Sequence, residues 1–289
     1  MTRAQRALLL VANLVAAGAF AWPLIVPAVP SQAQAAAPWA ALALVPIAVV
    51  LILIALDASI RSATTLAMLG TLTAVGAAVR VAGTGVGGVE AVFVVLILAG
   101  RAYGARFGFL LGVLVIALSS FASGFGPWTP FQMVACAWVG AGAGLLPGGR
   151  RRGGDQRRGR ERGRGARWRE VALLASYGVV ASYAFGAVMN LWFWPFAVGP
   201  ETSISYSPDA PLATNLGSFL SYTLVTSTLT WDTIRAITSV VGIAVAGPAV
   251  LAALRRAKVR PENASRAPRS ASRAPRSASR TPRSASRTG

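Results

Sequence analysis

Side chains that can act as catalysts or metal ligands are scarce in this sequence. Its 289 residues include no histidine, nine acidic residues, one lysine (Lys258) and one cysteine (Cys136). Without histidine, the commonest general base, the Ser-His-Asp arrangement and histidine metal sites are all absent. The sequence also lacks a Gly-x4-Gly-Lys-Ser/Thr loop, so the chain has no recognisable means of hydrolysing ATP. We therefore expect no catalytic residue, no metal site and no cofactor in this chain.

One turn combines stiffness with polar and aromatic side chains. Residues 124–132 read Gly-Phe-Gly-Pro-Trp-Thr-Pro-Phe-Gln, in which Pro127 and Pro130 fix their φ angles and remove two backbone donors. Trp128 and Gln132 then project from a rigid frame. A tryptophan here is equally typical of the aromatic belt at a membrane boundary, whereas an amide at the start of a membrane span needs a polar partner. Both residues are candidates for binding a substrate.

A second candidate set lies where an apolar stretch ends, in Met-Asn-Leu-Trp-Phe-Trp-Pro-Phe at 189–196. Asn190, Trp192 and Trp194 can present an amide and ring faces to a flat or polar small molecule. An aromatic belt is the alternative for the two tryptophans. It explains Asn190 less well, because that residue lies deeper in the stretch.

Four ionisable residues complete the candidate substrate site. Arg80 and Glu90 lie at neighbouring ends of two apolar stretches, where an internal ion pair between them is the structural alternative. Asp232 and Arg235 are predicted to open the last helix, with Asp232 favouring the helix N-terminus through the dipole. Arg235 should face protein or water, because its exposure to lipid is costly. Residues 199–218 form a segment long enough to act as a lid.

The elements that position these residues are apolar. Hydrophobic residues make up 54% of the chain, charged residues 13%, and the mean hydropathy is +0.57, which excludes an ordinary soluble enzyme and global disorder. Most of the apolar stretches match the thickness of a bilayer. The sequence predicts an all-α membrane protein, a bundle of about eight transmembrane helices. The stretches are 7–29, 39–56, 63–82, 89–99, 107–123, 129–146, 171–198 and 233–254.

The basic residues predict the orientation. With the N-terminus inside, 26 of the 28 arginines and lysines fall on the inner side, and only Arg80 and Arg235 lie outside. We therefore expect a multi-pass protein of the plasma membrane with both termini in the cytoplasm. The first stretch resembles a secretory signal that precedes a small-residue cleavage site. Its length favours a retained helix.

The net charge of +19 is concentrated in two segments, at 148–169 and in the tail from 259, where Ser-Arg-Ala-Pro-Arg-Ser-Ala repeats. The tail is a low-complexity, disordered segment, which we expect to lie near anionic membrane lipids and not to bind nucleic acid. Small residues spaced four apart, Ala63 with Ala67 and Ala74 with Ala78, allow close helix packing. They serve packing within the chain or contact with a separate membrane subunit.

Residues 62–147 resemble the substrate-binding S components of energy-coupling factor (ECF) transporters, in the cobalamin-type branch. The resemblance rests on the Ala-rich stretch ending at Arg80, on Gly-Val-Glu-Ala at 88–91, on Gly100 and Gly108, and above all on residues 124–133. It implies a six-helix bundle with an outward pocket, a coupling membrane subunit and two ATPase subunits that use ATP. It implies that Ala63 and Ala67, or Ala74 and Ala78, contact the coupling subunit.

The expected organisation is two N-terminal helices (1–60), two halves of an S-component-like core (61–147 and 170–258), a cytoplasmic Arg/Gly-rich loop (148–169) and the tail (259–289). The expected function is capture of a vitamin-like small molecule, cobalamin or a related compound, from outside. One alternative is a membrane scaffold or anchor that acts through its basic segments. Another is a membrane-embedded transferase, which the few acidic residues make less favoured.

Overall fold

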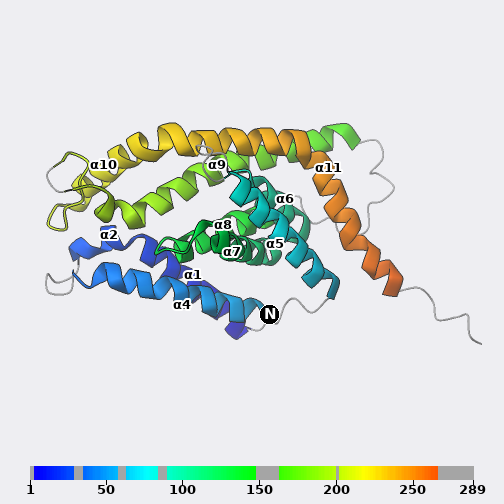
Figure 1. Ribbon diagram of the computed structural model, residues 1–289, viewed down its shortest axis with the longest axis horizontal. Helices are drawn as coiled ribbons and strands as arrows, with labels where there is room; N and C mark the ends of the chain where they lie inside the picture. The colour runs from blue at the N-terminus through cyan, green and yellow to red at the C-terminus, as the bar shows by residue number, and fades with distance from the viewer. Residues whose placement is uncertain are drawn as a thin grey trace, which may run out of the picture.

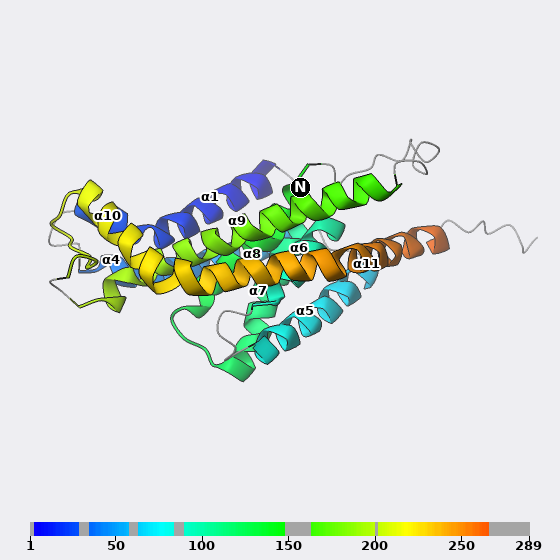
Figure 2. The same ribbon diagram turned by 90° about the horizontal axis from the view of Figure 1, so that it is seen from above.

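The computed structural model describes residues 3–28, 35–57, 63–83, 90–147, 163–199 and 202–265. Residues 163–169 of the predicted basic loop begin a helix, and residues 259–265 of the predicted disordered tail continue the last helix, so the predicted bounds of both segments are wrong at these ends. The rest of the loop and of the tail lies outside the described residues. The described residues form an elongated bundle of helices and contain no strand. Figure 1 shows α1 and α4 along one edge of the bundle and α9 with α11 along the opposite edge. In Figure 2, α5 lies on the periphery, on the opposite side from α1.

The described residues of the eight predicted apolar stretches are almost all helical. The elements in chain order are α1 (Arg3–Phe20), α2 (Trp22–Ile25), the 3-10 turn η1 (Val26–Ala28), α4 (Ala37–Asp57), α5 (Ala63–Gly83), α6 (Val92–Tyr103), α7 (Ala105–Ser123), α8 (Thr129–Leu145), α9 (Gly163–Ala197), α10 (Leu212–Thr223), the π-helix η2 (Leu224–Asp232) and α11 (Thr233–Ser265).

Four helices in the described part of the chain are long and apolar enough to cross a membrane. They are Ala63–Gly83, Ala105–Ser123, Gly165–Ala197 and Leu212–Ala257, while Ala37–Leu51 and Val92–Tyr103 are shorter apolar helices. The predicted all-helical membrane class is therefore supported. The count of about eight spans stays a prediction.

The distribution of side chains fits a lipid environment. Large apolar side chains face outward on several helices, for example Leu14 (70% exposed), Phe121 (80%) and Val245 (78%). Charged Asp232 and Arg235 are buried instead. Apolar surface of this kind is avoided by water-soluble monomers, whereas polar groups turned inward are expected in a bilayer.

The last helix begins earlier than the sequence predicts. Helix α10, η2 and α11 join into one continuous run that starts at Leu212, directly after Pro211. Asp232 therefore lies inside a long helix, and the prediction that it opens that helix is wrong. The predicted lid is correspondingly shorter, because residues 212–218 belong to α10.

Glycines allow the close packing of α6, α7 and α8. A Cβ atom at Gly100 or Gly108 would overlap the backbone of Gly140, and a Cβ at Gly140 would overlap Gly108. No larger side chain fits at this crossing. These three glycines therefore hold the centre of the bundle together.

The N-terminal helices belong to the same core. Phe20 packs edge-on against Phe131 of α8, with ring centroids 5.0 Å apart. Trp138 Nε1 donates to Asn13 Oδ1 at 2.7 Å, and Trp22 Nε1 donates to the carbonyl oxygen of Trp192 at 3.0 Å. Residues of α1 and α4 share one hydrophobic cluster with α6 to α9. The N-terminal pair is thus packed onto the predicted core.

Candidate functional site

Two predicted site residues, Arg80 and Gln132, meet directly. Arg80 is in the last turn of α5, and its guanidinium donates to Gln132 Oε1 in the first turn of α8 at 2.9 Å. It also donates to Ser119 Oγ at 2.9 Å and to Ser123 Oγ at 3.2 Å, one turn apart on α7. We call these four residues the Arg80 cluster. It gives the amide of Gln132 the polar partner that the sequence argument required.

A second group centres on Arg235. The Arg235 Nε lies 2.6 Å from Glu90 Oε2, and its Nη1 lies 2.6 Å from Asp232 Oδ1. Ser227 Oγ donates to Asp232 Oδ2 at 2.9 Å, and the carbonyl of Ser182 accepts a bond from Arg235 Nη1 at 3.2 Å. We call Glu90, Ser227, Asp232 and Arg235 the Arg235 cluster. It joins the segment before α6 to the π-helix and the start of α11.

The surroundings of Arg235 favour its charge. The guanidinium carbon lies 4.8 Å from the ring centroid of Phe185 and 5.6 Å from that of Phe93, within cation–π range. Gly186 of α9 lies directly against the carboxylate of Asp232, with no room for a Cβ atom. Aromatic rings and a glycine thus let a fully buried acid and an arginine sit between helices.

Arg80 and Glu90 do not form the ion pair that the sequence suggested, because each of them has a different partner in the structure. Glu90 forms its ion pair with Arg235, whereas Arg80 binds the hydroxyls and amide described above. Only the Arg80 cluster includes a residue of α8, whereas the partners of Arg235 come from the segment before α6, from η2 and from α9. The four predicted ionisable residues therefore belong to two different clusters.

The end of α9 meets the start of α8 through aromatic stacking. The rings of Trp192 and Phe131 are 4.2 Å apart and inclined by 7°. Trp192 Nε1 and Asn190 Nδ2 are buried donors without a hydrogen-bond partner in the described structure. Buried donors are nearly always satisfied, so this pair requires an explanation. The sequence places Asn190 and Trp192 in the site, and the structure leaves both with an unused donor.

Trp194 and Trp128 have other surroundings. Trp194 is buried and donates from Nε1 to the carbonyl of Ile204 at 2.7 Å, and its ring packs against Tyr206 and Phe219. It therefore secures the connection between α9 and α10. Trp128 is partly exposed, and its ring lies over Gly126 of the same turn. Within the described part of the chain, no hydrogen bond or ring contact joins either tryptophan to the Arg80 or Arg235 cluster.

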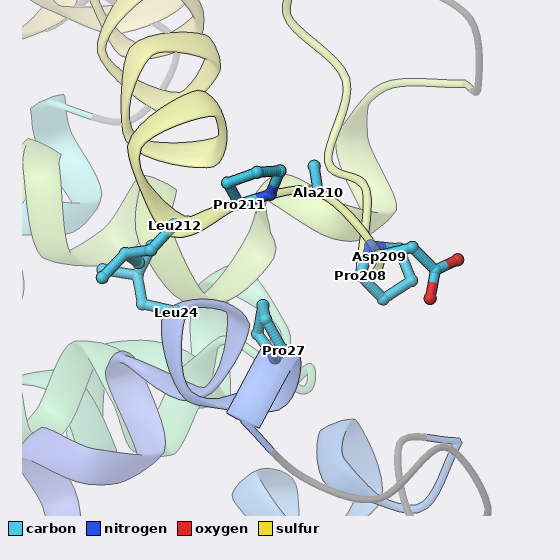
Figure 3. A pocket seen from close by; sticks show the side chains of 7 residues that line it. All are labelled: Leu24, Pro27, Pro208, Asp209, Ala210, Pro211 and Leu212. Atoms are coloured by element: carbon cyan, nitrogen blue, oxygen red, sulfur yellow. The ribbon is translucent and has the colours of Figure 1, made fainter.

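A surface groove lies where the sequence predicted a lid (Figure 3). Its volume is about 540 Å³, and one wall comes from α2 and η1 while the other comes from the corner before α10. The sequence analysis missed the first wall. In Figure 3, the carboxylate of Asp209 points away from Leu24 and Pro27. The lining residues are Leu24, Pro27, Pro208, Asp209, Ala210, Pro211 and Leu212.

Tyr206 is close to this groove in the chain and forms part of the connection between α9 and α10. Burial, together with the negative charge of Asp209, raises the pKa of its hydroxyl to about 12. The hydroxyl is buried without a partner in the described structure. It therefore stays neutral at physiological pH.

The predicted partner-interface residues lie on the outward face of α5. Ala63, Ala67, Ala74 and Ala78 are all exposed. The buried face of α5 is formed by Leu69, Thr73, Gly76 and Ala77 instead. The sequence offered two roles for these alanines, packing within the chain or contact with a separate membrane subunit. Because all four alanines are exposed, packing within the chain does not account for them.

No group of three or more potential metal ligands occurs among the described residues. Comparisons of this chain with protein families, curated proteins and solved structures find no match. The resemblance drawn from the sequence therefore stays a prediction.

Proposed function

We propose that this chain is the substrate-binding membrane subunit of an ECF-type importer, which captures a vitamin-like small molecule from outside. The observation that carries the proposal is the pair of polar clusters between the helices of a bundle with an apolar surface. Ionisable residues inside membrane helices mark substrate or ion sites by default, because their burial is costly. Together the clusters hold Arg80, Arg235, Glu90 and Asp232, a balanced set of two positive and two negative charges.

The Arg80 cluster is the part best suited to bind a solute. Arg80 and Gln132 are each half-buried, so they are less enclosed than Arg235 and Asp232. A solute with a carboxylate or amide group would replace the bond between Arg80 and Gln132 with bonds of its own. Charge-assisted hydrogen bonds of this kind are stronger than neutral ones. Asn190 and Trp192 supply two further donors that a solute with acceptor groups would satisfy.

The chain would rely on partners for energy. It has no phosphate-binding loop, so ATP would be used by two ATPase subunits. The exposed alanines of α5 offer a surface of small side chains on which a coupling membrane subunit can pack closely. In this proposal, α5 to α11 form the S-component-like core, and α1 and α4 are two additional spans. The chain then crosses the plasma membrane about eight times with both termini in the cytoplasm.

Equilibrium binding to the purified protein in detergent tests the proposal, with a panel of vitamins and cobalamin first. We expect Arg80→Gln, Gln132→Ala and Asn190→Ala each to weaken binding of the ligand by more than about tenfold, a loss of roughly 1.4 kcal/mol. Thr71→Ala is the matched control, because Thr71 is exposed on α5 and bonds only to its own helix at Ala67. Unchanged affinity in all three variants would overturn the site.

The scaffold alternative makes a different prediction. A protein that acts only through its basic segments would bind no member of the panel, and removal of residues 266–289 would abolish its interactions. In the proposed importer subunit, the same truncation leaves solute affinity unchanged, because neither cluster includes a residue beyond Arg235.

A further inference from the structure

A second hollow lies at the opposite end of the long helices from the groove. It has a volume of about 210 Å³ and lies between the first turns of α9 and the second half of α11. Figure 1 shows these two segments at the end of the bundle away from α2 and α10. We call it the basal cleft. Its lining residues are Arg167, Glu170, Val171, Pro248, Leu251, Ala252 and Arg255.

The basal cleft has a charged rim and an apolar floor. Arg167 and Arg255 belong to the rim, and both residues are exposed. Val171, Leu251 and Ala252 are buried or half-buried. Pro248 interrupts the backbone hydrogen bonding of α11, and α11 changes direction along its second half (Figure 1). The cleft therefore presents two chemistries, one suited to an anion and one suited to hydrocarbon.

The charges on the rim do not cancel. The carboxylate of Glu170 is shared by two arginines, with Arg101 Nε at 2.9 Å and Arg255 Nη2 at 2.6 Å. Arg101 also donates to the carbonyls of Leu146 at 2.8 Å and Pro147 at 3.1 Å, which end α8. One carboxylate thus neutralises one of two guanidinium groups.

Arg167 adds a further positive charge to the cleft. Among the ion pairs of the described residues, none involves Arg167. The lining residues Arg167, Arg255 and Glu170 carry a net charge of +1 beside an apolar floor, and the buried Arg101 behind Glu170 raises the total to +2. Basic pockets between membrane helices of this kind suit the headgroups of anionic lipids.

We propose that the basal cleft binds an anionic phospholipid. The phosphate lies between Arg167 and Arg255, and the acyl chains leave the cleft along the apolar surface of α11. Val245 and Val250 are exposed on that surface, near the cleft. A free phosphate would use the rim alone and leave the apolar floor empty, so the combination favours a lipid. This site is separate from the Arg80 and Arg235 clusters and does not depend on which solute the chain captures.

Native mass spectrometry of the purified full chain, titrated with phosphatidylglycerol or phosphatidylcholine, tests the proposal. We expect phosphatidylglycerol to be retained at lower concentration than phosphatidylcholine. Arg167→Gln should weaken that retention about fivefold, the effect of one basic residue near a lipid phosphate. This variant leaves the pairs of Glu170 with Arg101 and Arg255 in place, so it is expected to fold.

The matched control is the double variant Arg169→Gln/Arg256→Gln, compared with Arg167→Gln/Arg255→Gln. Both doubles remove the same charge from the same two helices, but Arg169 and Arg256 do not line the cleft and are exposed. We expect only the Arg167/Arg255 double variant to lose the preference for phosphatidylglycerol.

Two results would overturn the lipid site. Equal losses in the two double variants would mean that anionic lipid is attracted by general surface charge. Complete displacement of phosphatidylglycerol by an excess of inorganic phosphate would mean that the rim is a phosphate site without a role for the apolar floor. Retention in the presence of phosphate, lost only when the cleft arginines are changed, supports the lipid.

Discussion

The guanidinium of Arg235 lies 2.6 Å from the carboxylate of Glu90, although 145 residues separate the two in the chain. The contact links the segment before α6 to the start of α11. Arg235 also pairs with the fully buried Asp232, so one arginine serves two acids. The two acids differ in surroundings, because the side chain of Glu90 is 36% exposed and that of Asp232 is inaccessible.

This difference predicts unequal effects of removing each charge. Arg235→Met should destabilise the protein by about 3–5 kcal/mol, because it leaves Asp232 as an unpaired charge in the interior. Glu90→Gln should cost only about 1 kcal/mol, since Glu90 can be hydrated and a neutral acceptor remains. Thermal unfolding in detergent measures both effects.

The pairing is tested further by a second substitution. Asp232→Asn in the Arg235→Met background should recover part of the lost stability, because the unpaired carboxylate is then absent. Equal losses for Arg235→Met and Glu90→Gln, with no recovery in the double variant, would show that the ion pairs do not stabilise the bundle.

The lengths of the apolar stretches were sufficient to predict the helices. Most stretches are long enough to cross a bilayer, where the backbone groups of a single segment are satisfied only within a helix, so length and composition predict the type of element. The contact between Arg80 and Gln132 was not predicted, because the sequence suggested Glu90 as the partner of Arg80. The partner of Glu90 was not predicted, because helix order around the bundle leaves no local pattern in the sequence.

The start of the last helix was mispredicted for a chemical reason. Residues 221–233 are rich in serine and threonine and look too polar for a membrane helix. In the structure two of these hydroxyls bond back to carbonyls of their own helix, Thr226 to Tyr222 at 2.7 Å and Thr233 to Thr228 at 2.7 Å. Such bonds hide the polar groups from lipid. The groove was missed because its walls, α2 and residues 208–212, are far apart in the chain.

The contact between Gly186 and Asp232 predicts a steric defect. Gly186→Ala places a methyl group on the Asp232 carboxylate, so the helices must separate or the ion pair must break. We expect a loss of about 1–3 kcal/mol, the usual cost of overpacking. Gly70→Ala is the control, because no atom lies within 4 Å of its added methyl group and alanine favours the helix. Thermal unfolding of the two variants in the same detergent should separate them, and equal midpoints would contradict the packing.

The packing of α2 predicts that the N-terminal helices stabilise the rest of the bundle. Trp22→Phe removes the buried hydrogen bond to the Trp192 carbonyl. The free energy of unfolding should therefore fall by about 1 kcal/mol. Trp39→Phe is the matched control, because Trp39 is 72% exposed and should tolerate the change. Intact mass of the purified protein provides a second readout, since a retained first helix leaves residues 3–28 in place. A product that lacks these residues, or equal stability of the two variants, would contradict the role of α2.

The charge distribution predicts which end of the bundle faces the cytoplasm, and the single cysteine makes the test simple. Cys136 is buried, so the unmodified chain should give little labelling by a membrane-impermeant maleimide in intact cells. Ser203→Cys, in the exposed connection before α10, should be labelled from outside. Arg256→Cys, near the end of α11, should be labelled only after the membrane is permeabilised, because arginine-rich segments stay on the cytoplasmic side. The opposite labelling pattern would reverse the orientation and place the basal cleft on the outer leaflet. Labelling of both positions from outside would contradict the assignment of α10 to α11 as a membrane span.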